Sequence, residues 1–180
     1  FDSSLSMTTV HDVFAQVGYI INQFVPELYW VPWIPDSHVL SVITTEKYNI
    51  KFIERYKNLK ILIAPNFVGR LCPLRELYVR EIVVCKIKGD ISFLAGKPIE
   101  KITTVHFQSN PKTLENCPIR YLDIEFYEGS LNFLSKCPLE HISISTYYGE
   151  LSPITRCPIK SVYMPSLPRQ YLISLFGSEI

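Results

Sequence analysis

The stretch CPLEHISISTYYGELSPITRCP, at residues 137–158, begins and ends with the same Cys-Pro pair. The interval between its cysteines, Cys137 and Cys157, also separates Lys97 from Cys117 and Cys117 from Cys137, and each of these residues is followed by proline. A fixed period of about 20 residues is typical of proteins built from stacked structural repeats. The spacing therefore predicts an array.

Apolar residues recur at fixed places within each unit. In the unit that starts at Cys137 they follow the patterns L-x-x-L-x-L and G-x-L-x-x-L, at Leu139, Ile142, Ile144, Gly149, Leu151 and Ile154. The first pattern predicts a short strand whose alternate side chains point inward, and the glycine permits a backbone turn that a Cβ would hinder. Because a single unit of this length cannot bury its apolar edge alone, we expect the units to stack with their strands parallel.

This pattern resembles the leucine-rich repeat, in a short variant whose Cys-Pro stands where another apolar residue is usual. The resemblance covers residues 57–165 and lacks the usual asparagine after the strand, and Thr104 interrupts one unit. It implies an α/β solenoid, a short leucine-rich-repeat array with a parallel β-sheet on its concave face. A further unit aligns at Cys72, and its longer interval to Lys97 predicts an insertion between strand and turn.

The flanking segments predict helices. Residues 8–25 carry apolar side chains at helical spacing, a second helix is expected from Asp36 or Ser37 through Ile43, and a third at 49–56. Residues 1–56 are thus expected to form a helical cap or an F-box-like module, since 38–56 loosely resembles the end of that motif.

A short capping helix is expected within residues 166–180. Pro168 stands near its first position and Gly177 just past its last, which is the usual asymmetry of helix ends. Leu172, Leu175 and Phe176 would cover the open apolar end of the stack.

Composition narrows the classes of partner. The 180 residues include 18 lysines and arginines and 17 acidic residues, and the two signs are interspersed along the chain. We therefore expect no long-range electrostatic attraction of nucleic acid or anionic lipid. The sequence has neither an apolar run of membrane-spanning length nor a signal-peptide pattern at its start. Five cysteines, an odd number, and no Asn-x-Ser/Thr acceptor favour an intracellular, cytoplasmic location.

The cysteines and histidines show no motif for chemistry. No C-x-x-C or H-x-x-x-H pair occurs, and the four histidines are scattered, so no metal site, cofactor or enzyme activity is expected. Stacked in register, Cys117, Cys137 and Cys157 would form a ladder of buried thiols, with a metal site or a disulfide as the alternatives. Asp123 and Glu125 share one strand face, either as a catalytic pair or as part of a solvated surface.

What the repeat defines is a surface. The outward strand positions combine tyrosines, charges and small hydroxyls, a composition suited to protein recognition. The residues expected to bind a partner are Tyr78, Arg80, Tyr121, Asp123, Glu125, His141, Ser143 and Tyr163. The alternative is an ordinary exposed strand face with no partner.

Three roles follow from this interpretation. The first is a non-enzymatic module that binds another protein through the concave face. The second, implied by the F-box-like resemblance, is a substrate adaptor that contacts a ubiquitin-ligase adaptor protein. The third is a structural subunit of a larger assembly, such as a viral one, which 13% aromatic residues and a net charge near zero would suit.

Overall fold

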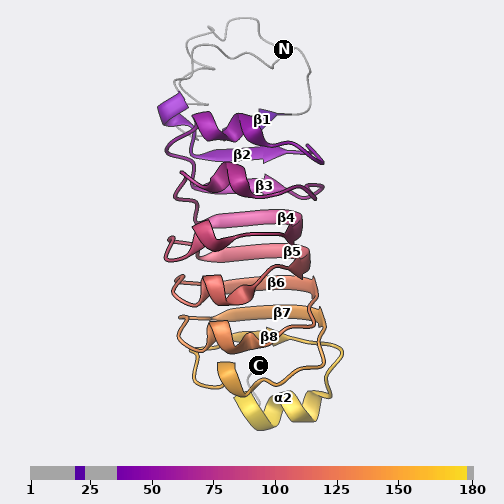
Figure 1. Ribbon diagram of the computed structural model, residues 1–180. Helices are drawn as coiled ribbons and strands as arrows, with labels where there is room; N and C mark the ends of the chain where they lie inside the picture. Colours follow the sequence, from indigo (N-terminus) through magenta and orange to yellow (C-terminus); the bar gives the residue numbers. More distant parts are fainter. Residues whose placement is uncertain (1–18, 23–35, 178–180) are drawn as a thin grey trace, which may run out of the picture.

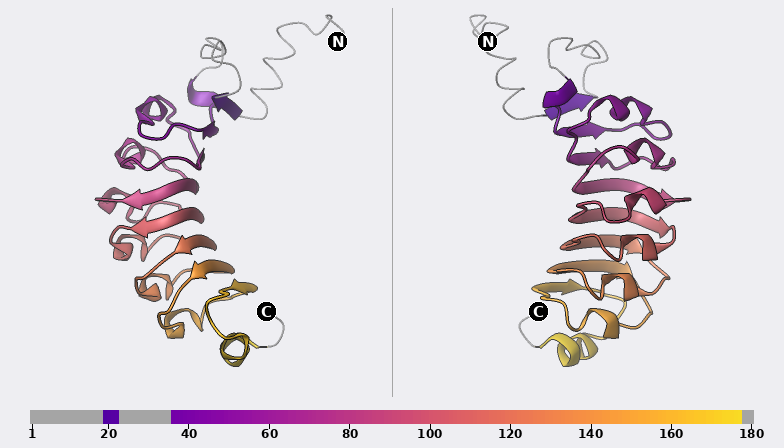
Figure 2. Two further views of the ribbon diagram at one scale, coloured as in Figure 1. Left: turned by 90° about the vertical axis from the view of Figure 1, so that its right-hand side faces the viewer. Right: turned by 60° about the vertical axis from the view of Figure 1, so that its left-hand side comes forward.

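The computed structural model describes residues 19–22 and 36–177, which wind into a solenoid (Figure 1). Its eight strands form one sheet in sequence order, each parallel to the next. They are β1 (Tyr19–Asn22), β2 (Ser41–Thr44), β3 (Ile61–Ala64), β4 (Glu81–Lys88), β5 (Lys101–Gln108), β6 (Tyr121–Phe126), β7 (His141–Thr146) and β8 (Ser161–Tyr163). Figure 2 shows the stack curving so that the sheet lies on the inner, concave side. The leucine-rich-repeat solenoid expected from the sequence is confirmed.

Short 3-10 turns carry the chain back along the convex side. They are η2 (Asp36–His38), η3 (Lys51–Arg55), η4 (Cys72–Leu74), η5 (Ser92–Leu94), η6 (Pro111–Leu114), η7 (Leu131–Leu134) and η8 (Ser152–Ile154). Their leucines and isoleucines, such as Leu94 and Leu134, are buried against the strands. The L-x-x-L half of each unit therefore supplies the convex wall of the core.

The register of the sheet keeps the period of the sequence from β2 to β8. The residues that begin these strands are direct neighbours: Ser41, Ile61, Glu81, Lys101, Tyr121, His141 and Ser161. Leu77, rather than Cys72, thus stands one unit before Lys97. The expected insertion is wrong, because Cys72-Pro73 begins the turn η4, where proline suits the first positions of a helix.

The helix expected from residue 36 or 37 through Ile43 is also wrong. This segment forms η2 and then the strand β2, and Tyr19–Asn22 forms β1 within the segment expected to be helical. The rest of residues 1–35 lies outside the described residues. The three-residue spacing of Val39 and Val42 fits a helix, but it equally fits the start of L-x-x-L-x-L, and both side chains are buried as in the other units.

The cysteine ladder lies in the core as expected. Cys117 and Cys137 are buried, and Cys157 is half-buried near the end of the stack. Each thiol donates to a backbone carbonyl that lies 20 or 23 residues earlier in the chain: Cys117 to Leu94 at 3.4 Å, Cys137 to Cys117 at 3.3 Å and Cys157 to Leu134 at 3.3 Å. Burial raises the pKa of Cys137 to about 11, so this thiol is protonated and unreactive at neutral pH.

Lys97 takes the place of a cysteine in this ladder. Its buried Nζ donates to the carbonyls of Leu74, Arg75 and Leu77 at 2.9, 2.6 and 2.5 Å. These three bonds satisfy an ammonium group that would otherwise be costly to bury, and the burial lowers its pKa. The hydroxyl of Thr104 is satisfied in the same way, by the carbonyl of Cys85 at 3.1 Å.

Aromatic side chains occupy the place of the asparagine that is usual in this repeat. Tyr127 and Tyr147 are buried and stack at 6.1 Å between ring centroids, and their hydroxyls donate to the carbonyls of Ser130 and Glu150. Each ring lies against the glycine two residues later. A Cβ on Gly149 would come within 2.4 Å of the Tyr147 hydroxyl oxygen. This glycine makes room for a ring and does not have the positive φ of a special turn.

The helix α2 (Arg169–Phe176) ends the described chain, with Pro168 before its first residue and Gly177 after its last. Leu172, Leu175 and Phe176 are partly buried against the core. The C-terminal capping helix is therefore confirmed.

Replacing Gly149 with alanine tests the ring–glycine contact. Glycine-to-alanine at negative φ normally stabilises a protein by about 0.4–1 kcal/mol, through the unfolded state. Here we expect a loss of about 1–3 kcal/mol, because the new Cβ overpacks against a buried ring. Urea unfolding measures the change.

The variant Tyr147→Leu provides the matched background. With the ring removed, Gly149→Ala should cost less than in the wild type, and the difference isolates the contact. A neutral or stabilising effect of alanine in the wild-type background would contradict this account.

Candidate functional site

The concave face of the sheet is built from alternate strand residues. Along β4, β5 and β7 the burial alternates, with the second and fourth side chains inside and the first and third half-exposed. The outward positions of neighbouring strands are in register, so they form rows that run across the sheet. Side chains that lie one period apart in the sequence are therefore direct neighbours on this face.

A shallow hollow of about 230 Å³ lies over β5 to β8. Five of the residues expected to bind a partner line it: Tyr121, Asp123, His141, Ser143 and Tyr163. Lys101, Thr103 and Ser161 complete its polar lining, and they occupy equivalent outward positions on β5 and β8.

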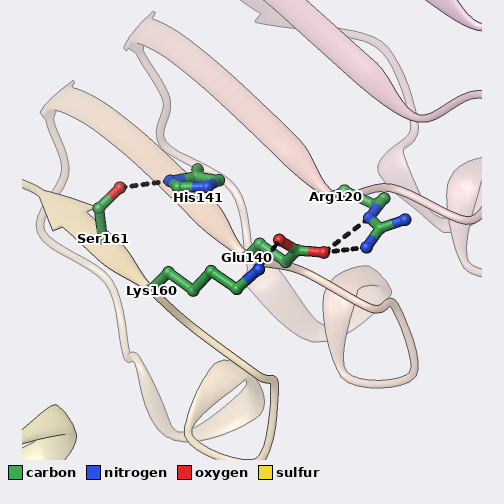
Figure 3. A network of polar contacts seen from close by, with 5 residues as sticks. All are labelled: Arg120, Glu140, His141, Lys160 and Ser161. Atoms are coloured by element: carbon green, nitrogen blue, oxygen red, sulfur yellow. Dashed lines mark hydrogen bonds and ion pairs between the residues drawn. The ribbon is translucent and has the colours of Figure 1, made fainter.

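Aromatic stacking orders one wall of the hollow. The rings of Tyr121 and His141 are 4.6 Å apart between centroids and nearly parallel, at 9°. On its other side His141 Nδ1 lies 2.7 Å from Ser161 Oγ, and Figure 3 shows the imidazole pointing toward that hydroxyl. A side chain held from two sides has less rotamer entropy to lose when a partner binds.

The other three expected residues lie elsewhere. Glu125 is exposed on β6, two residues beyond Asp123. Tyr78 and Arg80 precede β4 instead of lying on a strand, so their expected place on a concave strand is wrong. The error follows from aligning Cys72 with the cysteine ladder. Tyr78 is exposed beside Lys97, whose Nζ lies 5.3 Å from its ring centroid.

A row of charges at the edge where the strands begin is a feature that the sequence interpretation missed. Glu140 is buried and accepts hydrogen bonds from Arg120, one unit before it, and from Lys160, one unit after it. Figure 3 shows both cations pointing at this carboxylate. Arg80 and Glu100 form a looser pair in the same row, at 3.7 Å. The signal was present in the sequence as opposite charges one period apart.

Apolar side chains also gather on the concave face over β2 to β5, a feature that the sequence interpretation missed. They are the half-buried outward side chains of Ile43, Ile61, Ile63, Val83, Cys85 and Val105, and they lie beside the polar Glu81, Lys101 and Thr103. In the sequence most of them fall within continuous apolar runs such as ILIA and IVVC, so hydropathy assigns them to the core. Only the register of the strands distinguishes these outward side chains from the side chains of the core.

Metal-ligand clusters and membrane-spanning helices were sought in the part of the chain that the structure describes. No group of three or more His, Cys, Asp or Glu side chains in residues 19–22 and 36–177 is placed to hold a metal ion. Within the same ranges no helix has the length and apolar character needed to cross a membrane. What the site offers is an ordered set of side chains on a rigid sheet.

Comparison with known proteins supports the fold. A search of solved structures finds internalin C2 from Listeria monocytogenes, with a TM-score of 0.61 and 17% sequence identity. The match covers 71% of this chain and 62% of that one. This chain has the leucine-rich-repeat fold. No protein-family model matches it, and no curated protein does.

Glu140 predicts a dependence of stability on pH. Hydrogen bonds from Lys160 and Arg120 lower its pKa from 4.5 to about 2. A carboxyl with a lowered folded-state pKa stabilises the fold above its unfolded-state pKa, and this contribution disappears as the pH falls from about 4.5 to about 2. The variant Glu140→Gln should be less stable at pH 7 and lose less stability on acidification, as measured by urea unfolding at pH 7 and pH 3.

The exposed Glu128 supplies the control, because it has no ion pair among the described residues. Glu128→Gln should leave both measurements near the wild-type values. An unchanged acid sensitivity in Glu140→Gln would show that another group is responsible.

Proposed function

We propose that this chain is a non-enzymatic interaction module that binds another protein through the concave face of its solenoid. The observation that carries the proposal is the hollow over β5 to β8, where Tyr121, His141 and Tyr163 lie among charges and hydroxyls. Tyrosine supplies a large contact area with few rotatable bonds, and neighbouring polar groups set the register of a partner. A rigid sheet presents them with little reorganisation.

The exposure of these side chains also supports the proposal. Tyr163 is 61% exposed and Tyr121 is 42% exposed, so both present much of their rings to solvent. Exposed aromatic residues are frequent hot spots once a partner covers them.

The two other roles lack an observation of this kind. Residues 38–56, which loosely resemble the end of an F-box, form β2, the following turn and η3. A role as a structural subunit stays a prediction from composition, and light scattering on the isolated chain would test it. The concave-face role is the one that the geometry favours.

The double variant Tyr121→Ala/Tyr163→Ala tests the proposal. Binding partners are captured from a lysate with the tagged full chain and identified by mass spectrometry. Removing two hot-spot tyrosines should weaken capture of a genuine concave-face partner by about tenfold or more.

Tyr48→Ala/Tyr148→Ala is the matched control. These tyrosines are 69% and 81% exposed and lie in the turns that follow β2 and β7, outside the strands. Loss of capture in the control pair but not in the concave pair would refute the proposed face.

A further inference from the structure

The concave face changes character along the stack. Over β3 and β4 its outward side chains include the aliphatic Ile61, Ile63 and Val83, all half-buried, beside Glu81 at the start of β4. Over β6 to β8 the polar lining of the hollow replaces them. The two halves adjoin on one continuous sheet, so one bound segment running across the strands would contact both.

Asp123 is the free charge of the hollow. It is exposed, and within the described ranges it makes neither a hydrogen bond nor an ion pair. The lysine that lines the same hollow, Lys101, lies 3.5 Å from Glu81 and is thereby engaged. The charge left for a ligand to neutralise is therefore negative.

The surroundings of Asp123 suit a cation from a partner. Tyr121 and Tyr163 line the same hollow, and aromatic faces attract lysine and guanidinium groups. The hydroxyl of Ser143, the direct neighbour of Asp123 on β7, is a further hydrogen-bond acceptor. An anionic ligand would instead meet an unpaired carboxylate, which disfavours phosphate groups and acidic peptides.

We infer that the concave face binds an extended protein segment that carries aliphatic side chains and a lysine or arginine, with the basic group at Asp123. This inference rests on the proposed function and specifies the chemistry of the partner. The aliphatic side chains of the segment lie over β3 and β4.

The strand spacing sets the distance between the two parts of the segment. From Ile63 on β3 to Asp123 on β6 there are three strand intervals, or about 14 Å at the usual spacing of parallel strands. An extended chain covers about 3.3 Å per residue, so about four residues separate the aliphatic and basic anchors.

Selection from a phage-displayed library of random dodecapeptides on the immobilised full chain tests the inference. We expect enriched peptides to combine aliphatic residues with a lysine or arginine about four positions away. Selection on Asp123→Lys should enrich aspartate or glutamate at that position instead. The control Glu128→Lys makes the same charge change in the turn after β6 and should select the basic peptides.

A synthetic peptide from the wild-type selection then measures how much its basic residue contributes to the binding affinity. Fluorescence anisotropy should show that replacing its basic residue with norleucine weakens binding about tenfold, as loss of a charge-assisted hydrogen-bonded pair does. Against Asp123→Asn the same replacement should change little, because the pair is already broken. Circular dichroism confirms that each variant is folded.

The outcomes separate this inference from the proposed function. One outcome would be selected peptides that lack a basic residue but no longer bind the Tyr121→Ala/Tyr163→Ala variant. This result would overturn the inference and leave the concave-face role standing. Peptides that bind that double variant and Asp123→Lys as well as the wild type would count against both.

Discussion

The fold depends on one constraint: each repeat unit must bury its apolar edge against the next unit in an unchanged register. Because the strands are parallel and in register from β2 to β8, equivalent residues form continuous columns through the stack. A substitution is therefore tolerated only if it suits the residues one unit before and one unit after it. This makes the solenoid a nearly one-dimensional structure, whose stability resides in contacts between neighbouring units.

The departures from a uniform repeat follow from the same constraint. Lys97 occupies a cysteine position, and its Nζ donates to three carbonyls in and just after η4. The stacked rings of Tyr127 and Tyr147 replace the usual asparagine. The ring of Tyr147 fits only because the residue two positions later is a glycine. Glu140 couples three successive units through Arg120 and Lys160. On the concave face the same register places Tyr121, His141 and Ser161 side by side.

The sequence predicted those parts of the fold in which the repeat period and the hydropathy of the residues indicate the same structure. The repeat, the cysteine ladder and the C-terminal helix were all predictable, as were five residues of the hollow, because outward positions follow directly from L-x-x-L-x-L. It failed where one local pattern fits two structures. The spacing of Val39 and Val42 fits both a helix and a strand unit, and Cys72-Pro73 resembles the ladder although it begins a turn. The apolar side chains of the concave face were not recognised because hydropathy alone does not distinguish an outward valine from a core valine.

The register of the repeat continues unbroken through the segment around Cys72. Removing residues 77–96 deletes one whole unit, whereas removing residues 72–96 deletes the longer stretch that the alignment on Cys72 would count as a unit. Thermal unfolding followed by circular dichroism compares the two deletions directly. The account predicts a cooperative transition for the shorter deletion and its loss for the longer one, which shifts the following strands out of register. The reverse result would contradict it.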